Sequence, residues 1–295
     1  MSKLRYSEVF YSVQGEGRFV GVPSIFLRTY GCNFQCRGFG QPKGNLIPVT
    51  EMPYMNDPKA DPNHPEAYTS IEELPVTPIG CDSSASWAMK YKHLQKTQTV
   101  DEVFEEIVKC LPGGDFYGMF DEDIHLVITG GEPLLGWQRI WPELIEKCKK
   151  IGLCNITFET NGTQIVSEEL REYFNTAGNG VHVTWSTSPK LSISGEKKED
   201  ACIPESLQSM KGVANSYLYT KFVVRDASDF AEIEEFVQAY YDADIWLDAI
   251  YAMPEGATTS QLDLTEKQVA EECMNRGIRF SPRLHLALFD NQWGT

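Results

Sequence analysis

The feature that most constrains the fold of this chain is the alternation of short apolar strands with amphipathic helices. Apolar runs bounded by turn residues predict the strands, and apolar residues spaced three and four apart predict the helices. Strands are expected at 24–29, 124–128, 155–159, 181–185, 217–224, 245–251 and 278–280, and helices at 99–111, 142–152, 167–174, 228–241 and 264–275. Such alternation indicates parallel βα units. The sequence therefore predicts an α/β fold, an incomplete (β/α) barrel with about six core parallel strands.

Residues with unusual chemistry or backbone freedom lie at the end of several of these strands or shortly after it. They are Cys32, the run 129–132 (Thr-Gly-Gly-Glu), Glu159, Ser188 and the run 253–256 (Met-Pro-Glu-Gly). In a barrel of parallel strands the active site lies at the carboxyl ends of the strands. We therefore expect these residues to meet in one site.

Three cysteines are candidate ligands of an iron–sulfur cluster. Cys32 and Cys36 lie in the run Gly-Cys-Asn-Phe-Gln-Cys, and Cys81 opens the run Cys-Asp-Ser-Ser-Ala-Ser-Trp. Three thiolates can hold three irons of a [4Fe–4S] cluster and leave the fourth iron open. The usual radical-SAM spacing, Cys-x3-Cys-x2-Cys, would place the third cysteine at position 39, which is Phe39.

Two interpretations of this displaced spacing are open. Either the cluster site is lost, or Cys81 supplies the third thiolate after an insertion at 37–80. We favour Cys81, because the entropy cost of closing a loop grows only logarithmically with its length. The flanking Asp82, Ser83 and Trp87 support this choice. In the alternative, Cys81 is a small buried apolar residue, as single cysteines often are.

The insertion itself is rich in proline, with half of the chain's 16 prolines. Proline fixes φ and removes a hydrogen-bond donor, so no long helix or central strand is expected there. The sequence predicts an irregular surface loop, and a lid or a contact surface are the roles that a loop of this length suggests.

With the insertion removed, the cysteine run resembles the Cys-x3-Cys-x2-Cys-Asp-Thr-x-x-Ala-Trp run of the 7-carboxy-7-deazaguanine synthases. These are radical enzymes that use S-adenosylmethionine (SAM). The resemblance covers nearly the whole chain apart from the insertion. Its other matching pieces are 14–17 (Gln-Gly-Glu-Gly), 21–28, 129–133 (Thr-Gly-Gly-Glu-Pro), 159–163, 188–190 (Ser-Pro-Lys) and Arg283-x-His285.

The resemblance implies an activity and a set of cofactors. The activity is conversion of 6-carboxy-5,6,7,8-tetrahydropterin to 7-carboxy-7-deazaguanine by radical ring contraction with loss of ammonia, as in 7-deazapurine and queuosine-type biosynthesis. The implied cofactors are a [4Fe–4S] cluster, SAM and Mg²⁺. A homodimer and an external electron donor of the flavodoxin or ferredoxin type are also implied. No catalytic side chain is predicted beyond the cluster and the SAM radical.

The resemblance also assigns site residues. Cys32, Cys36 and Cys81 would hold the cluster, and the Ser83 hydroxyl would bind Mg²⁺ where the family has threonine. Contacts with SAM are expected from Gly80, Asp82, Gly130, Gly131, Glu132, Ser188, Pro189 and Lys190. Contacts with the substrate are expected from Val13, Gln14, Gly15, Glu16, Arg28, Thr129 and His285.

Some of these roles also follow from the residue types. Glycines such as Gly131 expose the backbone to a ligand, and the Glu132 carboxylate can accept from the SAM ammonium group. Arg28, at the end of a strand, suits a carboxylated substrate because guanidinium binds carboxylate bidentately. For His285, a paired structural histidine is an equal alternative.

Composition sets the remaining expectations. The chain has 295 residues and a formal net charge of −16, which argues against a nucleic-acid partner. Cys110, Cys148, Cys154, Cys202 and Cys273 are expected to be structural thiols. No apolar run is long enough to span a membrane, and residues 1–5 do not resemble a signal peptide. A single-domain cytoplasmic protein is expected, in the host cytoplasm if the chain is viral.

Two other functions are compatible with the displaced cysteine. One is a pterin-binding or partner-binding protein without a cluster. The other is a different radical-SAM enzyme, such as a glycyl-radical activase.

Overall fold

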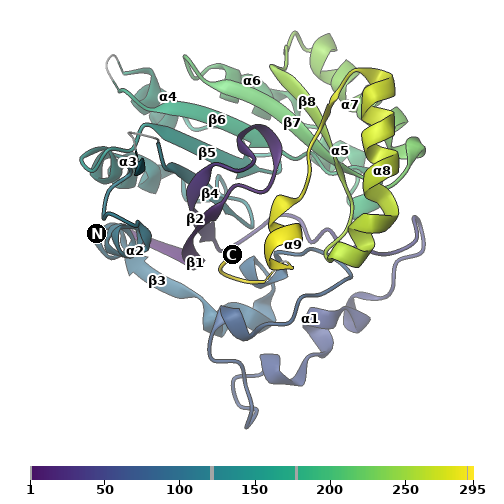
Figure 1. Ribbon diagram of the computed structural model, residues 1–295, viewed down its shortest axis with the longest axis horizontal. Helices are drawn as coiled ribbons and strands as arrows, with labels where there is room; N and C mark the ends of the chain where they lie inside the picture. The colour runs from purple at the N-terminus through teal and green to yellow at the C-terminus, as the bar shows by residue number, and fades with distance from the viewer. Residues whose placement is uncertain (1, 120–122, 177–178, 291) are drawn as a thin grey trace.

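The fold is described by a computed structural model, which covers residues 2–119, 123–176, 179–290 and 292–295. Within these residues nine strands form one sheet in the order β3-β1-β2-β4-β5-β6-β7-β8-β9 (Figure 1). The strands are β1 (Lys3–Val13), β2 (Pro23–Thr29), β3 (Lys96–Thr99), β4 (His125–Gly130), β5 (Asn155–Thr160), β6 (His182–Thr187), β7 (Tyr217–Val224), β8 (Ala249–Pro254) and β9 (Arg279–Phe280).

The strands from β2 to β9 run parallel, and β1 is antiparallel to both β2 and β3. The sheet is open, with β3 and β9 at its two edges. This confirms the predicted α/β fold with an incomplete barrel. Six of the parallel strands are four residues or longer, and β9 adds two residues at the edge.

Two strands are additional to the prediction, and one predicted strand has bounds that differ by more than two residues. The β1 strand was not predicted, and its pairing with β2 is irregular between Tyr6 and Glu8, where polar side chains are buried. The short β3 strand was also not predicted. We expected a strand at 245–251, but β8 begins at Ala249. The reason is that Ile245 donates its N–H to the Tyr240 carbonyl (2.9 Å), so it packs against the end of the preceding helix.

Helices follow most of the parallel strands. They are α1 (Pro53–Asn56), α2 (Val100–Cys110), α3 (Trp141–Lys149), α4 (Glu168–Asn175), α5 (Lys198–Ala201), α6 (Pro204–Lys211), α7 (Ala227–Asp242), α8 (Thr259–Arg276) and α9 (Leu284–Phe289). The predicted helices correspond to α2, α3, α4, α7 and α8, whereas α1, α5, α6 and α9 were not predicted. Helix α2 begins with the capping box of Thr99 and Glu102 that its sequence indicated.

The larger helices lie along one side of the curved sheet (Figure 1). Alternate side chains of each strand point to opposite faces. In β2, Ile25 and Leu27 are fully buried in the main hydrophobic core, while Phe26 and Arg28 point to the other face and line a cavity. The helix side of the sheet is therefore the core, and the opposite side carries the site.

The insertion is not a simple solvated loop. Residues 37–80 contain only short helical pieces, such as α1, and no strand. Together with 81–91 they build a hydrophobic cluster of their own, composed of Met52, Tyr54, Ala60, Ile71, Leu74, Ala85, Ala88 and Tyr91. The insertion therefore packs around the segment that follows Cys81. Separately, no helix in the described ranges combines the length and apolar character needed to cross a membrane.

Candidate active site

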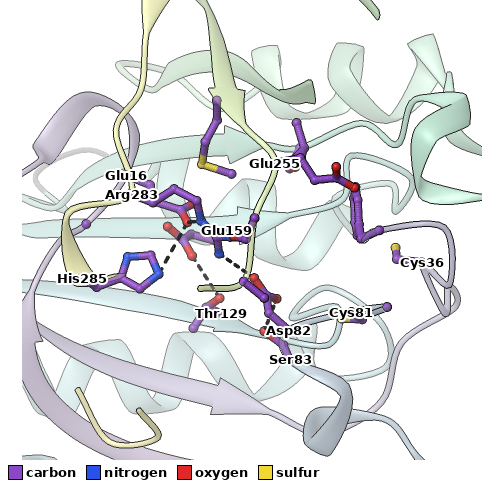
Figure 2. Close-up of a pocket in the computed structure, with 18 of the residues that line it drawn as sticks. Glu16, Cys36, Cys81, Asp82, Ser83, Thr129, Glu159, Glu255, Arg283 and His285 are labelled. Carbon is purple, nitrogen blue, oxygen red and sulfur yellow. Dashed lines mark hydrogen bonds and ion pairs between the residues drawn. The ribbon is translucent and has the colours of Figure 1, made fainter. Parts of the chain in front are cut away.

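The open face of the sheet carries a cavity of about 700 Å³ at the carboxyl ends of the parallel strands. Figure 2 shows that Cys36 and Cys81 lie at one end, and that Glu16, Arg283 and His285 lie at the other. The glycine-rich loop after β4 and the base of the insertion complete its wall. The cavity thus has a sulfur-bearing end and a charged end.

All three candidate cluster ligands line this cavity. Cys32 and Cys36 follow β2, and Cys81 returns at the far end of the insertion. A backbone hydrogen bond closes the insertion: the Gly80 N–H donates to the Phe39 carbonyl (2.8 Å). The two ends of the insertion therefore meet, and Cys81 lies beside the loop of Cys32 and Cys36 despite the sequence separation.

The chain holds the loop of the first two cysteines firmly. The Glu196 carboxylate accepts the N–H groups of Gln35 (2.9 Å) and Cys36 (2.7 Å), and the Phe34 N–H points at the Cys32 sulfur (3.4 Å). Cys36 has a positive φ of 48°, which marks a sharp turn at the ligand.

Burial sets the protonation of these thiols. It raises the pKa of Cys32 to about 11 and that of Cys81 to about 12, and the pKa of Cys36 is raised as well. The Lys190 ammonium acts in the opposite direction on Cys32 and Cys36. The three groups are therefore thiols in the free protein, and binding of iron would release their protons.

These thiols fit an iron–sulfur cluster better than a single metal ion. In the described part of the chain, no three His, Cys, Asp or Glu side chains converge as the ligands of one ion would. In a cluster each cysteine binds a different iron, so the sulfur atoms stand further apart. All eight cysteines are free, and no disulfide competes for these three.

The loop after β4 approaches the cysteine loop closely. Gly130 has a φ of 127°, and a Cβ at Gly131 would overlap the Gly31 carbonyl and lie 3.1 Å from the Cys32 Cβ. Only glycine allows this approach. Gly130 and Gly131 line the cavity, as a backbone contact with SAM requires.

Glu132 does not face this cavity, in contrast to the prediction for it. The residue is fully buried, and its carboxylate accepts from the Thr160 hydroxyl (2.8 Å) and from the N–H groups of Asn161 (2.8 Å) and Leu134 (3.0 Å). The Glu132 carboxylate is therefore hydrogen-bonded to nearby donors, and it links the loop after β4 to the end of β5. Burial raises the pKa of this carboxyl.

Of the three residues at 188–190, which follow β6, two line the cavity and one does not. Ser188 and Lys190 line the cavity, and the Lys190 ammonium donates to the Ser188 hydroxyl (3.0 Å). Pro189 is not part of the lining and packs beside Gly162 instead (3.9 Å from an added Cβ). Gly80 and Asp82, the other predicted SAM contacts, both line the cavity.

A buried network of charges forms the opposite end of the cavity. The Glu16 carboxylate pairs with Lys221 and with the Arg283 Nε (3.1 Å), and the Arg283 Nη2 pairs with Asp82 (2.5 Å). The Arg283 Nη1 also donates to the Gly256 carbonyl. Burial alone would raise the pKa of Glu16, but Lys221 and Arg283 outweigh it and hold that pKa below its usual range.

His285 lies beside this network. Its Nε2 is 3.9 Å from Glu16, and burial lowers the pKa of the imidazole to about 4, so the ring is neutral at pH 7. A Cβ at Gly15 would overlap the His285 ring. Gly15 and His285 therefore depend on each other for their positions, and both line the cavity.

A hydrogen-bonded group surrounds Glu159 on the floor of the cavity. The Gln14 amide (3.1 Å) and the Thr129 hydroxyl (3.1 Å) both donate to its carboxylate. Val13 lies next to Gln14 in the same wall. All of these predicted substrate contacts are thus at one place.

Arg28 connects β1 to the segment that follows Cys81. Its Nε donates to the Glu8 carboxylate (2.7 Å), and its Nη1 donates to the Ser83 hydroxyl (3.2 Å). The Ser83 hydroxyl in turn donates to Asp82 (3.2 Å). The predicted Mg²⁺ ligand is therefore in contact with the predicted carboxylate-binding arginine.

Sequence reasoning did not assign roles to several residues that shape the site. They are Glu8, Glu159, Glu196, Lys221, Arg225, Glu255 and Arg283. A signal existed for Lys221, which is a lysine inside an otherwise apolar strand. Glu255 follows a strand directly, and Glu159 lies at the end of one. For Glu196 we find no local sequence signal.

An open α/β sheet with three free cysteines and a glycine-rich loop at the carboxyl ends of its strands defines the class of the protein. It has the fold of the radical-SAM enzymes. The structure of QueE from Escherichia coli shares this fold, with a TM-score of 0.54, 20% sequence identity, and coverage of 96% of this chain and 95% of that chain.

Sequence comparison makes the relation specific. The chain is 29% identical to a 7-carboxy-7-deazaguanine synthase of Halobacterium salinarum, over 98% of this chain and 91% of that protein. It is 28% identical to the synthase of Rhodopirellula baltica, over 100% of this chain and 90% of that protein. No family model matches the chain. The predicted resemblance is confirmed: the chain is similar to these 7-carboxy-7-deazaguanine synthases over 98% or more of its residues.

Proposed function

We propose that this protein converts 6-carboxy-5,6,7,8-tetrahydropterin to 7-carboxy-7-deazaguanine. The observation that carries this proposal is the meeting of Cys32, Cys36 and Cys81 at one end of a cavity whose other end is charged. The relatives that match the chain along its whole length are named for this product.

Residues at one end of the cavity would hold the cluster and SAM, and residues at the other end would hold the substrate. Cys32, Cys36 and Cys81 would hold the cluster, and the backbone at Gly131 with Ser188 and Lys190 would hold SAM. When bound, the cluster and SAM supply the 5′-deoxyadenosyl radical that takes a hydrogen atom from the substrate. The walls of the cavity exclude water from that step.

The charged end would orient the carboxypterin. Arg28 keeps one guanidinium edge on Glu8 and turns Nη1 into the cavity toward Ser83, where a substrate carboxylate could bind bidentately. Arg283 is already occupied by Glu16 and Asp82. The Glu159 carboxylate would accept N–H groups of the ring, since Gln14 and Thr129 hold it in place.

Further proposals accompany this function. Mg²⁺ would bind at the Ser83 hydroxyl with the substrate and water as its other ligands. We also propose a single domain carrying the insertion at 37–80, a homodimer, a flavodoxin or ferredoxin as electron donor, and a cytoplasmic location. The acidic net charge supports the absence of a nucleic-acid partner.

Anaerobic reconstitution of wild type, Cys81→Ala and the control Cys110→Ala tests the proposal. Cys110 is half-buried on α2, on the other side of the sheet. Wild type and Cys110→Ala are expected to bind about four irons, to show an EPR signal that SAM changes, and to consume the carboxypterin. Cys81→Ala is expected to lose the SAM-dependent signal.

Other results would favour the rival functions. A wild type that takes up no cluster but binds the carboxypterin would be a pterin-binding protein. A loaded enzyme that cleaves SAM but leaves the carboxypterin unchanged would be a different radical-SAM enzyme, such as an activase. If Cys81→Ala equals wild type, Cys81 is not the third ligand.

A further inference from the structure

Both ends of the insertion are attached to one segment of the barrel, residues 255–261, which joins β8 to α8. At the first end, the Glu255 carboxylate accepts the Gly40 N–H (2.8 Å). Glu255 is itself held by Arg225, whose Nε (2.5 Å) and Nη2 (2.8 Å) donate to its two oxygens. The Glu255 side chain is only 9% exposed, so this bidentate pair is well shielded from water.

At the second end, Gln261 in the first turn of α8 holds Pro78. The Gln261 side-chain amide donates to the Pro78 carbonyl (3.0 Å), and its oxygen accepts the Ala257 N–H (2.8 Å). Gln261 is therefore fixed to the 255–261 segment at the same time as it holds the insertion.

The two held ends are in contact with each other. Gly40 has a φ of 72°, and a Cβ there would overlap the Pro78 carbonyl. One residue before Gly40 and two residues after Pro78, the two ends meet again, where the Gly80 N–H donates to the Phe39 carbonyl (2.8 Å). Cys81 is the residue next to Gly80, so the hydrogen bond between Gly80 and Phe39 holds the backbone directly before Cys81.

Other contacts hold the chain before the insertion and after Cys81. Glu196 accepts the N–H groups at Gln35 and Cys36, upstream of the insertion. The insertion cluster packs behind Cys81 through Met52, whose Cε lies 2.6 Å from an added Cβ at Gly80. Beyond Cys81, Arg283 pairs with Asp82, and the Gly31 N–H donates to the Ser86 carbonyl (2.8 Å). The 255–261 segment adds the contacts that hold the backbone leading into Cys81.

We propose that the 255–261 segment, through Glu255 and Gln261, positions Cys81 as the third ligand of the cluster. Glu255 and Gln261 are thus positioning residues. The role of Cys81 as a ligand rests on the proposed function, but its positioning can be tested without the cluster.

The first test measures the alkylation rate of each cysteine by peptide mass spectrometry in the full chain without cluster, using iodoacetamide. The half-buried Cys110 serves as the internal reference. In Glu255→Ala we expect the rate at Cys81 to rise about tenfold, because a hydrogen bond to a charged group contributes at least this factor. In Gln261→Ala we expect a rise of about threefold, since a neutral hydrogen bond contributes less.

Matched controls come from α7. Glu232 also accepts a backbone N–H, that of Ser192 (2.7 Å), and Gln238 bonds only to Asp242 within its own helix (2.7 Å) among the hydrogen bonds of the described residues. Among the described residues, neither side chain has a hydrogen bond or ion pair to the insertion. Glu232→Ala and Gln238→Ala are expected to leave the rate at Cys81 within about twofold of wild type. An unchanged alkylation rate at Cys81 in folded Glu255→Ala would overturn the proposal. If circular dichroism shows that Glu255→Ala is unfolded, the alkylation rate at Cys81 in Gln261→Ala is the deciding measurement.

The second test uses the reconstituted protein. Glu255→Ala is expected to resemble Cys81→Ala in its iron content and in the loss of the SAM-dependent EPR change. Glu255→Gln keeps an oxygen acceptor for Gly40 and is expected to regain both. An Ala variant that exposes Cys81 yet binds a wild-type cluster would overturn the positioning role. If wild type itself binds no cluster, the proposed function fails, whereas the alkylation result still decides the positioning of Cys81.

Discussion

Replacing Arg283 by methionine tests whether ion pairs hold the charged end of the cavity together. Arg283 is 8% exposed and contacts three separate segments, through Glu16, Asp82 and the Gly256 carbonyl. Methionine is of similar length and apolar, so it preserves much of the packing while it removes the charge and all of its hydrogen bonds.

The expected loss in the free energy of unfolding can be estimated from these contacts. Removing one partner of a buried pair costs about 3–5 kcal/mol, because the other charge is left uncompensated. Here Glu16 would still pair with Lys221, and the Asp82 side chain is 35% exposed, so water would screen it. We therefore expect the lower end, a loss of about 3 kcal/mol in the free energy of unfolding at pH 7.

The stability loss in Arg283→Met is expected to depend on pH, and the pKa shifts give the direction of that change. Burial alone would raise the pKa of Asp82, but Arg283 outweighs it and holds the pKa below its usual range, as Arg283 and Lys221 do for Glu16. Carboxyls with lowered pKa stabilise the fold above their unfolded pKa near 4 and lose this contribution as pH falls through the folded pKa. The difference between wild type and Arg283→Met should thus shrink when the pH falls below about 4.

Urea unfolding of wild type and Arg283→Met at several pH values measures this difference. The control is Arg171→Met, because the Arg171 side chain is 41% exposed and its pair with Glu168 is long (3.8 Å). The control is expected to change stability by less than about 0.5 kcal/mol at every pH. A loss for Arg283→Met that is the same at neutral and acid pH would show that lost packing, and not charge, is responsible.

Three further predictions concern other parts of the chain. Gly131→Ala should push a methyl group against Cys32, destabilise the fold by about 1–3 kcal/mol, and lower the iron bound on reconstitution; full iron content would refute this close approach. His285 should show no NMR titration near its ordinary pKa of about 6.5, because burial lowers its pKa to about 4. Thr99→Ala should cost about 1 kcal/mol in thermal or urea unfolding by breaking the capping box with Glu102, and iron content should stay at the wild-type value.

Local signals in the sequence were sufficient for most of the parallel strands. The strand at 217–224 was predicted with the bounds that the structure shows, because apolar runs and flanking turn residues are properties of neighbouring positions. The capping box at Thr99 is equally local. The motifs at strand ends were expected to meet because the carboxyl ends of parallel strands share one edge, and they do line one cavity.

Local signals failed where burial depends on distant segments. Glu132 follows a strand like the other site residues, but Thr160 and Asn161 occupy its carboxylate from the next strand end. The apolar Ile245 was taken for the start of a strand, although it packs on the end of α7. In both cases the sequence pattern is compatible with either role, and the neighbour in space decides.

The sequence by itself determined the order of strands and helices, the glycine and cysteine motifs, and the place of the insertion between them. Only the tertiary structure decided that Phe39 and Gly80 join its ends, that Glu255 and Gln261 hold those ends, and that Arg283 connects Glu16 to Asp82. The physical reason is that periodicity, capping and turn chemistry act between residues close in sequence, whereas these contacts join groups 41 to 267 positions apart. The pairing of such groups is set only when the chain has folded.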